Sequence, residues 1–272
     1  MNQAAAKQTF GECRVNTLPG EGKVSMEIKD NYWKKAEKIW ERGLDLVFPA
    51  RCPVCDEPAP FPELICPACR EKPAPVPEPR CQKCGKHIGD EREEYCKGCR
   101  VVMHRFDRGM GAFTYHSVAK SMYRFKYAGR REYARFYGEE IVKRLGSFIR
   151  EWKPDALVPV PIHYTRKRER GYNQAEVLAG VIGRKMGIPV ESRLIKRVKK
   201  TLPQKLLGDR ERQNNMKRAF KIDRNDVKLK VIIIIDDIYT TGSTVDACAA
   251  VLKSAGVKKV YFITAAIGKE LL

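Results

Sequence analysis

Eight of the ten cysteines form four pairs that share the same two-residue gap, namely Cys52/Cys55, Cys66/Cys69, Cys81/Cys84 and Cys96/Cys99. Each Cys-x-x-Cys turn points two thiolates at one ion, and two such turns complete a tetrahedral zinc site that leaves no position for water. The spacing therefore predicts two structural zinc sites. A disulfide framework is disfavoured because the first 25 residues lack the apolar region of a secretory signal. A thioredoxin-like redox motif would need one pair on a βαβ unit, not four in a loop-rich stretch.

The pairing of the four turns has two solutions. Sequential pairing joins the first turn to the second and the third to the fourth, whereas a cross-braced arrangement alternates them. The segment from Lys72 to Pro79 contains four prolines and favours sequential pairing, because it makes a stiff spacer between two knuckles. This region is too small to bury a core of its own, so metal binding is expected to supply its folding energy.

A second segment with chemical potential runs from Val231 to Thr244. Five aliphatic residues are followed by Asp236 and Asp237, then by a hydroxyl-rich turn, and a helix is expected to begin near Ser243 or Thr244. Ligands of parallel sheets lie at the carboxyl ends of strands, and backbone N–H groups at a helix N-terminus bind phosphate. Two carboxylates beside such a cradle suit sugar hydroxyls or a bound Mg²⁺. The segment predicts a site for a phosphorylated ribose, and a capped surface turn is the simpler alternative.

The elements around these motifs alternate between strands and helices. Strands are expected over residues 109–115, 156–160, 231–235 and 259–266, and helices over residues 117–127, 131–148, 172–186 and 243–254. The strand from Val231 to Ile235 is apolar throughout, as in a parallel sheet buried on both faces. The order strand, helix, strand predicts an α/β fold with a parallel sheet flanked by helices.

The expected organisation has four parts. They are a disordered N-terminus over residues 1–29, an amphipathic helix over residues 30–48, a double zinc ribbon over residues 49–104, and an α/β domain over residues 105–272. Met26 is a possible alternative start.

Charge points to an anionic partner. The chain has 53 Lys and Arg against 33 Asp and Glu, a formal net charge of +20. A net +11 of this excess lies between Arg166 and Arg218. Such a field attracts nucleic acid or phosphorylated small molecules, and a basic face that contacts only solvent is the open alternative. No apolar run approaches the roughly 20 residues of a membrane span, and a cytoplasmic location is expected.

Two basic stretches have more than one interpretation. The run from Arg166 to Arg170 can clamp pyrophosphate, contact nucleic acid or meet only water. The stretch from Tyr123 to Tyr137 interleaves six aromatic residues with cations, a combination that single-stranded DNA binders use for stacking and phosphate contact. Aromatic residues at helical spacing more often face the core, so core packing is the favoured interpretation.

The string from Asp236 to Thr244 resembles the signature of type I phosphoribosyltransferases, which bind 5-phosphoribosyl-1-pyrophosphate (PRPP) with Mg²⁺. The resemblance implies that Asp236 and Asp237 contact the ribose hydroxyls. It implies that the 5′-phosphate is held by Thr240, Thr241, Gly242, Ser243 and Thr244. The implied counterparts of the pyrophosphate contacts are the loop from Pro159 to His163 and the cations Arg166, Lys167, Arg168 and Arg170.

Two further segments, from Val158 to Gln174 and from Thr201 to Phe220, resemble the ComF family, as does the cysteine spacing. That family joins N-terminal zinc ribbons to a phosphoribosyltransferase domain and includes proteins needed for DNA uptake in competent bacteria. The resemblance implies a PRPP-binding protein that acts in nucleoside- or nucleotide-type phosphoribosyl transfer or in DNA uptake. It suggests a DNA-translocating helicase and recombination mediators as partners.

The alternative to an enzyme is an accessory protein that binds single-stranded DNA and uses the PRPP fold as a sensor or scaffold without turnover. A purely structural adaptor would leave the Asp-Asp string without a purpose. No motif identifies the acceptor or a general base, although His163 and Glu169 lie near the expected site.

Overall fold

The computed structural model describes residues 50–198, 219–223 and 228–268. The disordered N-terminus predicted for residues 1–29 and the helix predicted for residues 30–48 lie outside the described residues. Most of the segment from Thr201 to Phe220 lies outside them as well.

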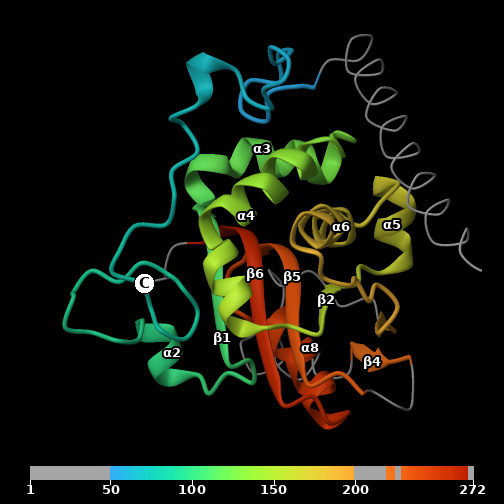
Figure 1. Ribbon diagram of the computed structural model, residues 1–272. Coiled ribbons are helices and arrows are strands. Elements are labelled where there is room, and N and C mark those ends of the chain that lie inside the picture. The colour runs from blue at the N-terminus through green and yellow to red at the C-terminus, as the bar shows by residue number, and fades with distance from the viewer. Residues whose placement is uncertain (1–49, 199–218, 224–227, 269–272) are drawn as a thin grey trace, which may run out of the picture. The chain divides into compact units, whose positions relative to one another are not determined.

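A four-stranded parallel sheet organises the described chain (Figure 1). Its order is β1 (Arg108–Thr114), β6 (Lys259–Ile267), β5 (Val231–Tyr239) and β2 (Ala156–Pro159). Because all neighbours are parallel, the four carboxyl ends lie at one edge of the sheet. This confirms the expected α/β fold and brings the ends of β5 and β2 together, since Ile235 pairs with both Pro159 and Ile263.

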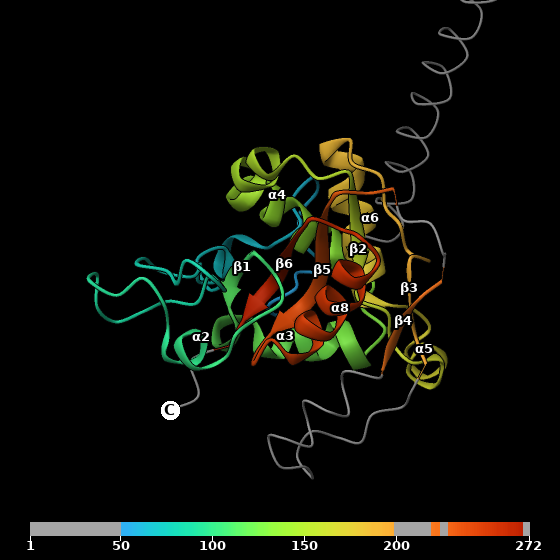
Figure 2. The ribbon, with the colours of Figure 1, turned by 90° about the horizontal axis from the view of Figure 1, so that it is seen from below.

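Different elements pack against the two faces of the sheet (Figures 1 and 2). Helices α4 (Tyr133–Trp152) and α6 (Gln174–Met186) pack with Ile233 and Ile235 on one face. Helix α8 (Ser243–Ser254) packs with Ile232 and Ile234 on the other, together with the hairpin of β3 (Ile195–Arg197) and β4 (Phe220–Ile222). Burial on both faces explains why the aliphatic run of β5 does not alternate with polar residues.

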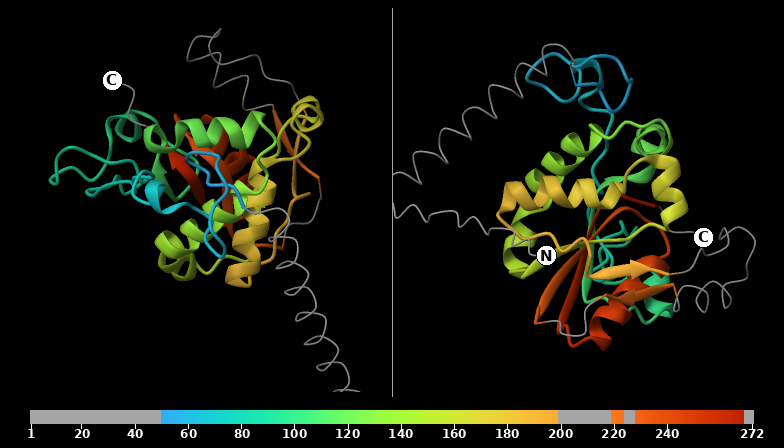
Figure 3. Two further views of the ribbon diagram at one scale, coloured as in Figure 1. Left: turned by 90° about the horizontal axis from the view of Figure 1, so that it is seen from above. Right: turned by 90° about the vertical axis from the view of Figure 1, so that its right-hand side faces the viewer.

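Helices α3 (Tyr115–Tyr127) and α5 (Tyr164–Arg170) follow the carboxyl ends of β1 and β2. Figure 3 shows α3 from above. Two short elements lie in the cysteine-rich region, η1 (Pro67–Cys69) and α2 (Lys97–Val101). Within the described part of the chain, no helix combines the length and apolarity that crossing a bilayer requires.

The predicted strands and helices of the α/β region are confirmed within a few residues at their ends, with three differences. Strand β5 continues to Tyr239, so the acidic pair lies inside the strand and not after it. The basic run forms helix α5, which sequence periodicity missed because it carries no apolar stripe. The β3–β4 hairpin was not predicted either, since strands of three residues are too short for a period-two pattern.

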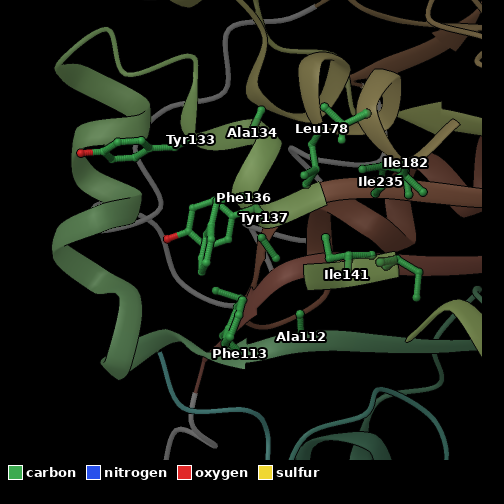
Figure 4. Close-up of a cluster of buried hydrophobic side chains, with 14 of the residues drawn as sticks. Ala112, Phe113, Tyr133, Ala134, Phe136, Tyr137, Ile141, Leu178, Ile182 and Ile235 are labelled. Carbon is green, nitrogen blue, oxygen red and sulfur yellow. The ribbon is translucent and has the colours of Figure 1, made fainter. Parts of the chain in front are cut away.

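The aromatic stretch from Tyr123 to Tyr137 divides between core and surface. Phe125, Tyr133, Phe136 and Tyr137 are buried, and Figure 4 shows the last three in the core cluster, with Phe136 and Tyr137 near Phe113. The hydroxyl of Tyr137 is paired with Ser121 Oγ at 2.6 Å, which satisfies its polar atom inside the core. Tyr123 and Tyr127 are exposed. The favoured interpretation, core packing, is confirmed for four of the six rings.

Candidate functional site

The eight paired cysteines gather into two groups of four. One group is Cys52, Cys55, Cys66 and Cys69, and the other is Cys81, Cys84, Cys96 and Cys99, with the thiol sulfurs of each group within 4.8 Å of one another. The pairing is therefore sequential, as the proline-rich spacer favoured.

The geometry of both groups suits zinc. A tetrahedral site with Zn–S bonds of about 2.3 Å separates its sulfurs by roughly 3.8 Å. The Cys55 and Cys66 sulfurs are 3.7 Å apart, and so are those of Cys84 and Cys96. Four-thiolate sites are closed, so these two sites are structural and hold the ribbons together.

The first ribbon, which carries the Cys52 group, docks where α3 leads into α4. Arg130 Nη2 lies 2.7 Å from Asp56 Oδ2, and the Tyr133 hydroxyl donates to Asp56 Oδ1 at 2.5 Å. Arg124 donates to the Val54 carbonyl at 3.0 Å. The Arg130 guanidinium and the Tyr133 hydroxyl hold the pKa of Asp56 below its ordinary value, although burial opposes them. This ribbon (blue in Figure 1) therefore rests on helices and not on the strand ends.

The two acids of β5 point to opposite faces of the sheet, because neighbouring residues of a strand alternate. Asp237 is 8% exposed, and its Oδ2 lies 3.0 Å from Lys126 Nζ at the end of α3. Asp236 faces the α8 side, where it interacts electrostatically with Cys248 and Arg197. The backbone N–H of Asp237 donates to Asp236 Oδ1 at 2.8 Å. One acid is thus matched by a lysine at close range, whereas the other has an electrostatic interaction with Arg197.

Burial, and next the charge of Asp237, raise the pKa of Asp236 to about 8, while Lys126 opposes this rise. Burial beside a second carboxylate disfavours the charged form of an acid, and acids with a raised pKa cluster at functional sites.

The turn after β5 is open to solvent. Thr240 and Thr241 are exposed, and Ser243 and Thr244 are half-buried in the first turn of α8. Gly242 caps the helix with φ +83°, in the left-handed region that glycine adopts without strain. The structure thus brings the predicted loop residues to one helix N-terminus, which offers N–H groups and a favourable dipole to an anion.

The Arg-Gly-Tyr-Asn-Gln stretch has a structural explanation. Asn173 caps α6 and donates to the Val160 carbonyl at 3.0 Å. The Tyr172 hydroxyl and Gln174 Nε2 both donate to the carbonyl of Phe125. Phe125 directly precedes Lys126, so the stretch fixes the last turn of α3 and holds Lys126 opposite Asp237.

The structure does not bring the four cations of α5 together. Arg166, Lys167 and Arg168 are exposed, and Lys167 pairs with Glu176 at 3.4 Å. Arg170 turns away to stack over the ring of Tyr127, 4.8 Å from its centre, and to donate to Gln174.

Arg166 lies on the side of the hairpin. Burial lowers the pKa of Arg197, and the nearby positive charge of Arg166 lowers it further. His163, one of the residues near the expected site, caps α5 through its ring nitrogen, which lies 2.9 Å from Thr165 Oγ1. Glu169 is exposed.

Lys126 is the site residue that sequence reasoning missed. It lies inside the aromatic and basic stretch, and nothing in its local pattern distinguishes it from the neighbouring cations. Only the register of α3 against β5 shows that it is the one that meets an acid of the strand end.

Two family models match the chain. One is described as a double zinc ribbon domain and matches residues 43–100, and the other is described as a phosphoribosyl transferase domain and matches residues 166–270. The second match contains the acidic pair, the loop and α8.

Curated relatives carry names linked to competence and DNA use. The chain is 36% identical to competence protein F of Haemophilus influenzae over 109 residues, 39% of this chain and 48% of that protein. It is 35% identical to DNA utilization protein YhgH of Escherichia coli K12 over 103 residues, 38% of this chain and 45% of that protein. It is 28% identical to competence protein ComFC of Bacillus subtilis over 169 residues, 59% of this chain and 67% of that protein.

The match spans about half the length of the first two relatives and two thirds of ComFC. Among solved structures, a purine phosphoribosyltransferase from Pyrococcus horikoshii matches 50% of this chain and 91% of its own, with 18% identity and a TM-score of 0.30. The chain therefore joins a double zinc ribbon to a phosphoribosyl transferase domain and is similar to competence proteins F and ComFC.

Proposed function

We propose that this protein binds PRPP together with Mg²⁺ at the carboxyl end of β5, and that this binding serves a competence-related role in DNA use. The observation that carries the proposal is the order of groups at that strand end. Asp236 and Asp237 lie near the end of β5, and a solvent-open loop and the N-terminus of α8 come after that strand, all within the matched phosphoribosyl transferase segment. The names of the relatives support the DNA-related role.

Each part of PRPP has a matching group in this proposal. The 5′-phosphate accepts from the N–H groups at the start of α8 and from the hydroxyls of the loop, where the helix dipole favours an anion. The ribose hydroxyls donate to Asp236 and Asp237. Lys126 places a positive charge 3.0 Å from Asp237, which reduces the repulsion between the acidic pair and an incoming polyanion.

The pyrophosphate would lie beside the loop that follows β2. That loop continues along β5, since the Val160 N–H donates to the Ile235 carbonyl at 2.9 Å. Arg166 and Arg168 are exposed on helix α5, which follows this loop, and offer guanidinium groups to the pyrophosphate. Mg²⁺ bound with PRPP would supply positive charge against the pyrophosphate. Phosphoribosyl transfer would release this pyrophosphate, so its appearance in solution measures turnover.

Titration calorimetry with PRPP and Mg²⁺ tests the binding step. We expect the wild-type chain to bind and Asp237→Asn to weaken binding at least tenfold, because an amide carries no charge for Lys126 and accepts hydrogen bonds less strongly. Asp155→Asn is the matched control. Asp155 accepts from the N–H groups of Lys230 and Val231 at the opposite end of β5. Absence of heat with wild-type protein, or equal affinity of wild type and Asp237→Asn, would contradict the proposal.

A second function, binding of single-stranded DNA, is favoured by the exposed rings on α3. Tyr123 and Tyr127 are 65% and 61% exposed, and their ring centres are 5.1 Å apart. The guanidinium of Arg170, on helix α5, stacks over the Tyr127 ring at 4.8 Å from its centre. Exposed aromatic rings beside cations offer stacking surfaces to bases and contacts to phosphates.

Fluorescence anisotropy with a labelled single strand tests this second function. We expect Tyr127→Ala to weaken binding by about 1–3 kcal/mol, the usual contribution of a stacked base. Tyr95→Ala, which removes an exposed ring of the second ribbon, serves as the control. Binding that does not weaken with rising salt, or equal loss in both variants, would argue against a DNA surface here. The helicase and recombination-mediator partners stay predictions.

A further inference from the structure

The second zinc group packs near the end of β5, next to the loop that follows this strand. Cys81, Cys84 and Cys96 belong to the same buried cluster as Tyr239, the last residue of that strand. Tyr239 is 2% exposed and stacks on Phe262 at 4.5 Å. Lys86, two residues beyond Cys84, places its Nζ 5.7 Å from the centre of the Tyr239 ring. The ring of Tyr239 therefore fills the space between the second ribbon and the loop.

Gly242 rests directly on Tyr239 and on His104. A Cβ atom at position 242 would lie 2.6 Å from the Tyr239 hydroxyl oxygen and 3.1 Å from His104 Cε1. Contacts this close show that these two side chains pack directly against the backbone of the predicted phosphate loop. A shift of either side chain would move the N–H groups that face an anion.

The chain that leaves the second ribbon also fixes the first turn of α8. His104 follows Cys99 by five residues, and its Nδ1 lies 2.5 Å from Asp246 Oδ2. The N–H of Arg105 donates to Asp246 Oδ1 at 2.7 Å. Asp246 belongs to the first turn of α8, so both of its oxygens connect the helix N-terminus to this linker.

The second ribbon is fitted tightly to the edge of the sheet. The N–H of Gly109 in β1 donates to the Lys83 carbonyl at 2.9 Å. A Cβ atom at Gly85 would lie 2.6 Å from the Gly109 carbonyl oxygen and 2.9 Å from Met110 Cα. Lys83 lies between two zinc-binding cysteines, and Gly85 follows the second of them. The zinc-binding turn is therefore in direct contact with strand β1.

The first ribbon has a different neighbourhood. Cys52 and Cys69 belong to the cluster on the other face, which also contains Tyr133 and Phe136 of α4. Its described polar contacts reach α3 and α4 through Asp56 and Val54. The two zinc groups are therefore not equivalent with respect to the loop.

We infer that the second zinc group positions the phosphate loop through Tyr239, His104 and Asp246, so that zinc at this group and PRPP at the loop stabilise one another, whereas zinc at the first group does not take part. This inference rests on the proposed function. Its physical basis is preorganisation: a loop already held in its binding conformation loses less entropy when the ligand arrives. Linkage makes the effect reciprocal, so PRPP must raise zinc affinity at the second group by the same factor.

Equilibrium competition with a chromophoric zinc chelator tests the inference on the full zinc-loaded chain. The chelator concentration that removes half of each zinc is measured with and without PRPP and Mg²⁺. We expect PRPP to raise this concentration at least fivefold for one zinc and to leave the other unchanged. Protection of both zinc ions, or of neither, would overturn the inference.

Two serine variants assign the protected ion. Cys96→Ser leaves zinc only at the first group. The chelator concentration that removes this zinc should be the same with and without PRPP. Cys66→Ser leaves zinc only at the second group, and its removal should require more chelator when PRPP is present. The reverse assignment would overturn the inference.

A milder pair of variants keeps both metals bound. Tyr239→Phe removes the hydroxyl under Gly242, whereas Tyr133→Phe removes the hydroxyl that fixes Asp56 of the first ribbon. Both rings are buried and the change removes one atom. We expect Tyr239→Phe alone to reduce the protection of zinc by PRPP, and equal protection in both variants would count against the inference.

Hydrogen exchange separates failure of the inference from failure of the proposed function, because it needs no PRPP. Amide exchange across residues 239–246 should accelerate at least tenfold in Cys96→Ser and stay unchanged in Cys66→Ser. If wild-type protein binds no PRPP but shows this pattern, the proposed function fails and the positioning role stands. If exchange is unchanged in both variants, the positioning role fails whatever the result with PRPP.

Discussion

The pair of Lys126 and Asp237 allows a quantitative test of how the strand end is held. The two charges are 3.0 Å apart, and the side chains are 20% and 11% exposed. With an effective dielectric constant of about 20, their attraction is roughly 5 kcal/mol before desolvation is subtracted. Removing one partner of such a pair leaves a poorly compensated charge and typically costs about 3–5 kcal/mol. Replacing Lys126 with methionine keeps an unbranched apolar stem and removes the ammonium group that carries the charge.

We expect Lys126→Met to lower the free energy of unfolding by about 3 kcal/mol at pH 8, measured by urea denaturation. Asp237→Asn in the Lys126→Met background should recover part of this loss, giving a coupling energy of about 2 kcal/mol in the double-mutant cycle. Lys143→Met is the matched control. Its pair with Glu140 spans 3.9 Å and Lys143 is 76% exposed, so the change should stay within about 0.5 kcal/mol. A coupling energy no larger than this control would refute the argument that the pair fixes α3 over the strand end.

Three further predictions concern the acid, the loop and the metals. Burial and Asp237 raise the pKa of Asp236 from 3.8 to about 8, so the folded chain binds an extra proton between these values and its stability falls as pH rises through that window. Asp236→Asn should remove this fall and stabilise the protein by roughly 2–5 kcal/mol above pH 8, whereas parallel pH profiles of urea unfolding would contradict it. Gly242→Ala should lower the melting temperature more than Gly171→Ala does. Both glycines have positive φ, but only a Cβ at position 242 would lie against neighbouring atoms. Equal shifts of the melting temperature would argue against close packing under Gly242. Elemental analysis should find two zinc ions per chain, and their removal by a chelator should unfold both ribbons, seen as new protease cleavage within residues 50–104; ribbons that stay resistant without metal would exclude a structural role for zinc.

Local sequence patterns predicted the parts of this protein whose chemistry depends on neighbouring residues. Two Cys-x-x-Cys turns define a zinc site wherever they meet, and the proline-rich spacer indicated which turns meet. An apolar strand, two acids, a glycine turn and a helix start follow one another within residues 231–244, so the strand, the turn and the helix could be predicted without knowledge of the rest of the fold. The alternation of strands and helices fixed the fold class for the same reason.

Only the tertiary structure decided which distant residues support these motifs. Lys126 and Asp237 meet because the Arg-Gly-Tyr-Asn-Gln stretch fixes the end of α3. His104 reaches Asp246 across 142 residues of sequence. The environments of the two acids also differ only in the folded chain, since one faces a lysine and the other faces the α8 side. Such pairs depend on the register and packing of separate elements, and a linear pattern of residue types carries no record of either.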